Sequence, residues 1–120
     1  MREIENKEND RQETKYLLLD KSYLYNISSQ EIQNFIKRQE ISGYEPISNN
    51  LEAKKVQIGE VVRVDKKFYG VVRDTFSNSA GKLYPEFKGK SVIHFEIYTN
   101  NLDIPHLTKV VFPRVERIKI

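Results

Sequence analysis

The 120-residue sequence contains no cysteine, no tryptophan and only two histidines. Without cysteine the chain can form neither a disulfide framework nor a thiolate zinc site, and it offers no thiol nucleophile. It also lacks any run near the roughly 20 apolar residues that a membrane helix needs. Its charged N-terminus holds no apolar segment of the kind found in secretory signals. These absences predict a cytoplasmic or cytoplasm-delivered protein that does not enter a membrane, although a piece of a larger exported chain would have the same features.

Charged residues are abundant instead: they make up 31% of the chain, and the formal net charge is +3. The charge is uneven along the sequence. Residues 54–91 contain nine basic and four acidic residues, a net charge of +5, whereas residues 1–14 contain three and five, a net charge of −2. The basic segment suits an anionic partner, and a solvated lysine-rich sheet face is the alternative explanation.

Residues 1–14 have no apolar periodicity, so we expect a flexible polar tail followed by one domain over residues 15–120. One helix is expected early in this domain. Ser28 and Glu31 form a capping box, and the apolar residues that follow share one helical face: Ile32, Phe35 and Ile36. Gly43 lies where a left-handed residue would end the helix.

Short apolar or alternating segments predict strands at 15–20, 54–65, 66–76, 91–99 and, broken at Pro113, 108–120. The apolar residues on one face of the second of these are Val56, Ile58, Val62 and Val64. Gly59 and Gly70 are expected to bend or kink the chain, and residues 77–90 to form a long irregular loop. One helix with five to six short strands predicts an α+β domain, mainly β, built as a small barrel or sandwich.

The segment IHFEIY places a histidine beside a glutamate in the most strand-like part of the chain. Side chains of an extended strand alternate between two faces. One face is apolar and is expected to join the core: Ile93, Phe95 and Ile97. The other face is mixed and is expected to point outwards: Val92, His94, Glu96 and Tyr98.

His94 and Glu96 share a face, so they could bind a metal or act as an acid–base pair. A zinc site needs at least three protein ligands, and the only other histidine is His106, close to Asp103 but without a metal-binding spacing. The chain also has no serine nucleophile motif and no phosphate-binding glycine loop. We therefore expect no catalytic residue, no metal and no cofactor, and an enzyme is the least favoured function.

Two fragments together resemble a known family. VQIGEVVRVDKKFYGVV (56–72) is similar to the glycine-spaced hairpin of lysostaphin-type zinc endopeptidases, and IHFEIY (93–98) is similar to their C-terminal signature strand. By this resemblance His94 matches the third zinc ligand of the family. Val92 stands where the family has its catalytic histidine, and no histidine precedes His94 as an upstream ligand. The resemblance therefore implies a degenerate, non-catalytic β-fold.

Two functions fit these features. The favoured one is a protein-binding module, such as an adaptor, inhibitor or structural domain of a mobile element or secretion system. Its contact would be the aromatic loop at Tyr84, Pro85 and Phe87, unless the two rings only anchor the loop on the domain. The other function is nucleic-acid binding by a small β-barrel, with Phe68, Tyr69 or Tyr84 stacked on bases. The phosphates would then contact Arg63, Lys66, Lys67, Arg73, Lys82, Lys88 and Lys90.

Overall fold

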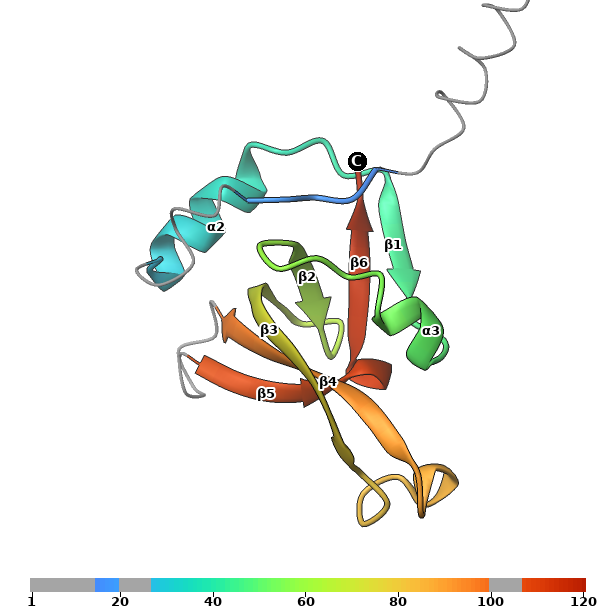
Figure 1. Cartoon of the computed structure of the whole chain (residues 1–120). Helices are drawn as coiled ribbons and strands as arrows, with labels where there is room; N and C mark the ends of the chain where they lie inside the picture. The colour runs from blue at the N-terminus through green and yellow to red at the C-terminus, as the bar shows by residue number, and fades with distance from the viewer. Residues whose placement is uncertain (1–14, 20–26, 100–106) are drawn as a thin grey trace, which may run out of the picture.

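Six strands form one antiparallel sheet in the order β1-β6-β2-β3-β4-β5 (Figure 1). The structure is a computed structural model and describes residues 15–19, 27–99 and 107–120. The strands are β1 (Gly43–Pro46), β2 (Val61–Val64), β3 (Phe68–Ser79), β4 (Ser91–Thr99), β5 (Leu107–Val111) and β6 (Val115–Lys119). The helices are α2 (Ser29–Lys37) and α3 (Asn50–Ala53), with the 3-10 turns η2 (Pro85–Phe87) and η3 (Phe112–Arg114). This architecture confirms the predicted α+β class, mainly β.

The sheet coils because β5 and β6 follow each other in the chain but lie four places apart in the strand order. The turn η3 joins them and carries Pro113 in its first turn, where a missing N–H breaks no ladder hydrogen bond. The predicted break at Pro113 is confirmed. Figure 1 shows β1, β6 and β2 at one end of the sheet and β3, β4 and β5 at the other, with η3 as the link.

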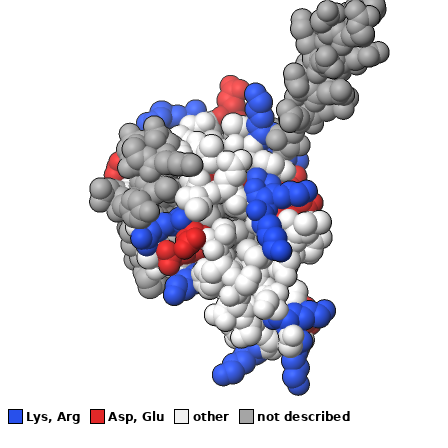
Figure 2. All heavy atoms as spheres, in the orientation of Figure 1, with Lys and Arg blue, Asp and Glu red and all other residues white. Residues whose placement is uncertain are grey.

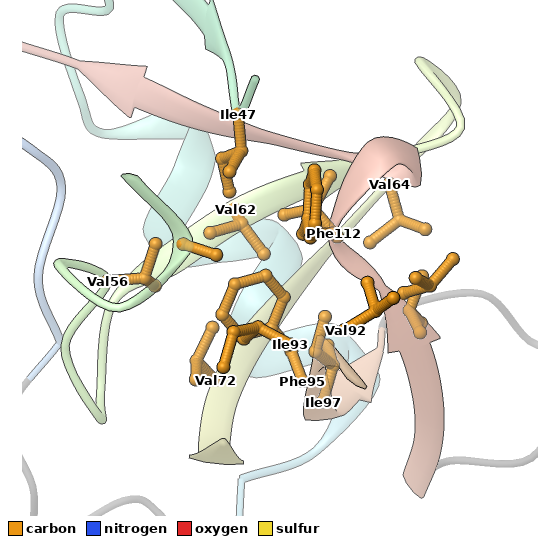
Figure 3. Packing of buried hydrophobic residues seen from close by; sticks show 14 residues of the cluster. Ile47, Val56, Val62, Val64, Val72, Val92, Ile93, Phe95, Ile97 and Phe112 are labelled. Atoms are coloured by element: carbon orange, nitrogen blue, oxygen red, sulfur yellow. The ribbon is translucent and has the colours of Figure 1, made fainter. Parts of the chain in front are cut away.

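Two hydrophobic clusters cover the two faces of the sheet. The inner cluster holds 14 buried residues (Figure 3), among them Val62, Val72, Phe95, Ile97 and Phe112. The outer cluster includes the buried residue of α2 and consists of Leu17, Leu19, Ile27, Ile32, Val61, Val71, Tyr98 and Ile118. Neighbouring valines of β2 and β3 therefore enter different clusters, and these strands are apolar on both faces.

The outward-facing prediction for β4 is wrong at two positions. Tyr98 is buried in the outer cluster, and Val92 is buried in the inner cluster. Tyr98 is covered because the α2 side of the sheet is a second core, a feature that one strand cannot reveal. Near Val92, the side chain of Asn50 in α3 accepts from the N–H of Ile93 at 3.0 Å and donates to the carbonyl of Ser91 at 2.9 Å. These bonds bring α3 against this end of β4.

The capping box of α2 is confirmed. The Ser28 hydroxyl accepts from the N–H of Glu31 at 3.1 Å, and the Glu31 carboxylate accepts from the N–H of Ser28 at 3.0 Å. The predicted glycine stop is wrong, because α2 ends at Lys37 and Gly43 begins β1. The Gln39 side chain donates to the carbonyl of Phe35 at 3.1 Å, and backbone bonds close the last turn. The helix end is thereby satisfied without a left-handed residue.

The first predicted strand is an extended segment that touches two strands without joining either as a ladder. The N–H of Leu17 bonds the carbonyl of Ile118 at 3.0 Å, and the N–H of Leu19 bonds the carbonyl of Gly59 at 2.8 Å. Leu17 and Leu19 are buried and Leu18 is exposed, as an extended chain requires. The predicted tail at 1–14 lies outside the described residues.

The second predicted strand is shorter than expected. β2 begins at Val61, and the residues before it form α3 and turns. Val56 is buried as predicted, but Ile58 is 41% exposed, so the common face predicted for both is wrong. The reason is Gly59, whose φ of +94° turns the chain ahead of β2. The predicted bend at Gly59 is confirmed.

Gly70 serves a close approach between strands, and the predicted kink at this position is wrong. The shift in register between β3 and β4 lies further on, between Val72 and Asp74. A Cβ atom on Gly70 would lie 2.2 Å from Cγ2 of Ile97 and 2.7 Å from the carbonyl oxygen of Tyr98. Only glycine lets β3 and β4 meet at this distance.

A buried ion pair connects the beginning of β2 with β6. The Arg117 guanidinium donates from Nε and Nη2 to the two carboxylate oxygens of Glu60, both at 2.7 Å. Its Cζ atom lies 3.4 Å from the ring centroid of Tyr16, and the Tyr16 hydroxyl donates to Glu45 at 2.7 Å. The N–H of Gln57 also donates to Glu60 at 3.2 Å. The two charges are therefore paired with each other although both side chains are buried.

We expect Gly70→Ala to lower the free energy of unfolding by about 1–3 kcal/mol, because the added methyl group overlaps atoms of β4. Gly43→Ala is the matched control, since its Cβ would meet its nearest neighbour, Cε of Lys119, at an ordinary 3.5 Å. The control should change stability by less than about 0.5 kcal/mol. Urea unfolding measures the free energy of unfolding of both variants. An equal loss of stability in the two would contradict the role of Gly70 in the close approach of β3 and β4.

Arg117→Met should destabilise the fold by about 3–5 kcal/mol, because it leaves Glu60 buried without its counter-ion. The double variant Glu60→Gln/Arg117→Met removes both charges and should recover a large part of that loss. Chemical denaturation of the single and double variants measures the difference. A double variant as unstable as Arg117→Met would show that lost packing, and not an unpaired charge, is responsible.

Candidate ligand-binding surface

The outer part of β3 and β4 projects from the domain as a two-stranded arm (Figure 1). The strands stay paired as far as Ser79 and Ser91, so the predicted irregular loop is shorter than expected and spans residues 80–90. This loop is folded on itself. The N–H of Tyr84 bonds the carbonyl of Ala80 at 2.9 Å, and η2 and a further turn complete it. The arm therefore presents a structured loop.

The two aromatic rings of the loop attach it to the domain. Tyr84 and Phe87 lie with centroids 6.1 Å apart, and Phe87 lies 5.6 Å from Phe112 of η3. Both rings are half-buried against the inner cluster, whereas Pro85 is exposed. Of the three predicted protein-contact residues, only Pro85 is exposed. Leu83, which was not predicted, is 84% exposed.

A surface pocket of about 490 Å³ lies between the arm loop, β4, β5 and η3. Its lining residues come from segments far apart in the chain: Ser79, Ala80, Gly81, Lys82, Leu83, Tyr84, His94, Lys109, Val111 and Arg114. Three of them are basic, one is histidine, and none is acidic. The pocket thus combines apolar walls with positive charge, which suits a ligand that has an apolar part and an anionic part.

His94 has defined contacts at the edge of this pocket. Its ring stacks on Phe76 with centroids 5.3 Å apart and an interplanar angle of 23°. Its Nδ1 atom lies 2.9 Å from the carbonyl oxygen of Val92, and because a carbonyl only accepts, Nδ1 carries the hydrogen. Nε2 is the ring nitrogen that this bond does not use.

Glu96, which shares a strand face with His94, forms an ion pair with Arg73 at 3.2 Å. Within residues 15–19, 27–99 and 107–120, no three histidine, aspartate or glutamate side chains lie close enough together to hold a metal ion. Asp103 and His106, the other residues considered for a metal, lie outside these ranges.

The basic residues predicted to contact phosphates fall into two groups. Arg63 pairs with Glu116 at 2.8 Å and lies with Cζ 3.5 Å from the ring centroid of Tyr44, and Arg73 pairs with Glu96. These two arginines stabilise the sheet. The lysines are exposed instead, at the β2–β3 turn and on the arm loop: Lys66, Lys67, Lys82, Lys88 and Lys90. Figure 2 shows basic side chains gathered at the tip of the arm.

Lys109 and Arg114 complete the basic lining of the pocket, and the sequence prediction missed both. They lie outside the basic segment of the chain, and only the coiling of the sheet through η3 brings them beside the arm loop. Arg114 also lines a neighbouring pocket together with Lys66. It therefore connects the β2–β3 turn with the arm. Lys88 and Lys90 line neither pocket but lie on the same arm loop as Lys82. We call these six residues together the basic surface: Lys66, Lys82, Lys88, Lys90, Lys109 and Arg114.

Asp65 holds Arg114 in place at the centre of this surface. The Arg114 Nε atom donates to Asp65 at 2.8 Å, and Nη2 donates to the second carboxylate oxygen. Asp65 and Lys66 have φ angles of +53° and +57° and form the tight turn between β2 and β3. The hydrogen bonds from Arg114 hold the pKa of the Asp65 carboxyl below its ordinary value of 3.8.

No protein-family model, curated protein or solved structure matches this chain. No helix in the described part of the chain is long and apolar enough to cross a membrane.

The pair Asp65–Arg114 should make stability depend on acid pH. Because the folded-state pKa of Asp65 lies below its unfolded value, the pair stabilises the fold above about pH 4 and loses this effect as the pH falls further. Asparagine tolerates the left-handed backbone at this position, so Asp65→Asn removes the charge without straining the turn. The variant should be less stable than the parent at pH 7 by up to about 1 kcal/mol, a small value because both partners of the ion pair are partly exposed.

The difference in stability between the parent and Asp65→Asn should become smaller below about pH 4. Thermal unfolding at a series of pH values measures it. Glu86→Gln, at an exposed acidic residue of the arm loop, is the control and should change the stability by less than about 0.5 kcal/mol. A constant difference between Asp65→Asn and the parent at every pH would contradict the ion pair as its cause.

Proposed function

We propose that this chain is a non-catalytic binding module that binds nucleic acid through the basic surface. The observation that carries this proposal is the pocket lining, which has three basic side chains and a histidine but no carboxylate. Arg114 is paired with Asp65, which lies outside this lining, so Lys82 and Lys109 supply the remaining positive charge of the pocket. Lysine and arginine side chains on a shared surface neutralise phosphates and supply most of the affinity of sequence-independent binding. Lys66 on one side and Lys88 and Lys90 on the other extend the positive charge beyond the pocket.

The distribution of ion pairs supports the same proposal. The described residues include 16 basic and ten acidic side chains, a net charge of +6. Four arginines of this part of the chain pair with carboxylates inside or across the sheet: Arg63, Arg73, Arg114 and Arg117. Four carboxylates are thereby neutralised within the fold, and lysines dominate the exposed charge around the arm. This arrangement attracts a polyanion at long range.

The absence of catalysis is part of the proposal and is supported by how the polar groups are used. Nδ1 of His94 is bound to the carbonyl of Val92, and Glu96 is paired with Arg73. General acid–base catalysis needs a group that can exchange a proton with the ligand at hydrogen-bond distance. Nε2 of His94 could exchange a proton in this way, but the pocket that His94 lines contains no carboxylate to act with it as a second acid–base group.

A partner protein is the second candidate, and one observation favours it. Leu83 is 84% exposed on a loop whose neighbours Tyr84 and Phe87 are fixed against the core. A large apolar side chain on a rigid projection is suited to fill a pocket in a partner. β5 also lies at an edge of the sheet, where an added strand can pair. An adaptor or inhibitor would use these two features rather than the lysines.

The two candidates are distinguished by fluorescence anisotropy of labelled single- and double-stranded RNA and DNA, from about 50 to 300 mM salt. We expect micromolar or tighter affinity at low salt. The triple variant Lys82→Gln/Lys88→Gln/Lys109→Gln should reduce the slope of log affinity against log salt by roughly 2, since each phosphate contact on a single strand contributes about 0.7.

The matched control is Lys15→Gln/Lys37→Gln/Lys54→Gln, which removes three exposed lysines that do not belong to the basic surface. It should keep the affinity and the slope close to those of the parent. Absence of binding to every nucleic acid at low salt would exclude this function and favour the partner protein. Equal losses in the two triple variants would show that net charge alone, and not the basic surface, attracts the ligand.

A further inference from the structure

We infer that the pocket beside the arm receives one unstacked base of a single strand, while the basic surface holds the phosphates on either side. This inference rests on the proposed nucleic-acid binding and adds the form of the ligand. It follows from the position of the cations at a pocket with apolar walls. A flat basic face could bind the phosphates of a duplex equally well. A pocket with apolar walls can in addition enclose a part of the ligand that is not a phosphate, and in a nucleic acid that part is a base.

The pocket has the size and the walls that a base requires. Its volume of about 490 Å³ lies within the roughly 300–1,000 Å³ of small-molecule sites. Ala80, Leu83 and Val111 supply aliphatic surface, and Tyr84 and His94 supply rings. Aromatic side chains stack on any base because every base has a π-face. Nε2 of His94 remains for a hydrogen bond to the edge of the base.

The cations around the pocket come from three elements, so they can contact phosphates on more than one side of an inserted base. Lys82 lies on the arm loop, Lys109 on β5 and Arg114 in η3. The bonds of Arg114 to Asp65 use Nε and Nη2, and Nη1 is not part of that contact. Arg114 is therefore oriented before a ligand arrives, and a phosphate need not order its side chain.

The path of the strand follows from the two pockets that share Arg114. One pocket contains Lys66 of the β2–β3 turn together with Asp65 and Glu116, whose carboxylates pair with Arg114 and Arg63, and the other contains Lys82 of the arm loop. Lys88 and Lys90 continue the charge towards the tip of the arm. A single strand laid from the β2–β3 turn to the arm thus meets a cation on each side of the base pocket. Bases of a duplex stay stacked inside the helix and cannot enter it.

The first test uses the full chain with short labelled oligothymidylates in which abasic residues replace one, several or all positions, because a homopolymer can avoid a single abasic position by a shift of register. The strand that is abasic throughout should bind roughly 5- to 150-fold more weakly than the parent strand, the loss expected when a stacked base is removed. A duplex of the same length should bind more weakly than the parent strand. Equal affinity for the parent strand and for every abasic oligonucleotide would overturn the inference and leave phosphate binding intact.

The second test fills the pocket without removing a cation. Ser79 lines the pocket at the exposed end of β3, so Ser79→Trp places an indole ring where the base would lie. Its affinity for the single strand should fall by the same factor as the affinity of the parent protein falls for the strand that is abasic throughout, and its affinity for duplex should not change. Asn78→Trp is the control, because Asn78 is exposed on the same strand but does not line the pocket.

The outcomes separate the two proposals. Parent protein that binds single strand and duplex equally, with Ser79→Trp unchanged, retains the proposed function and loses the base pocket. If the parent protein binds neither the single strand nor the duplex, both the proposed function and the base pocket are wrong. If Ser79→Trp does not fold, as judged by circular dichroism and thermal unfolding, the abasic series still decides the inference.

Discussion

The ion pair between Glu60 and Arg117 is the interaction on which the rest of the fold depends. It joins the residue before β2 to the middle of β6, and the ring of Tyr16 lies against the same guanidinium. A buried charge without its partner costs several kcal/mol, so neither strand can enter the core in its native place without the other. Through the bond from Tyr16 to Glu45 the constraint also reaches β1. The N-terminal segment, β1, β2 and β6 are thus required to assemble together.

This assembly determines where the candidate ligand surface lies. With β6 fixed beside β2, the turn η3 must carry the chain back to β5 at the far end of the sheet. That return places Arg114 and Lys109 beside the arm loop, and the ring of Phe87 packs against Phe112 to hold the loop there. The pocket is a product of the coiled sheet. Its charge does not come from any single segment of the chain.

Features with local causes could be predicted from the sequence, and features with distant causes could not. The capping box at Ser28, the bend at Gly59 and the break at Pro113 each depend on a few neighbouring residues, and all three were predicted correctly. The burial of Tyr98 and the close approach at Gly70 depend on what lies across the sheet. The basic segment shows the same limit. Arg63 pairs with Glu116 of β6, 53 residues away, whereas Lys66 is exposed at the β2–β3 turn, and nothing in the neighbouring sequence distinguishes the two. Lys109 and Arg114 join the surface only through topology.

The register shift between Val72 and Asp74 has a consequence for the arm. Val72 lies opposite Ile97 in the inner cluster, and Thr75, three residues on, lies opposite Phe95 in the same cluster. A regular strand would place residues three apart on opposite faces. The extra residue therefore inverts the phase of β3, so that Phe76 emerges beside His94 instead of entering the core. The first half of β3 therefore packs into the two hydrophobic clusters through Val71 and Val72. In its second half the inverted alternation places Phe76 at the surface, where its ring stacks on His94.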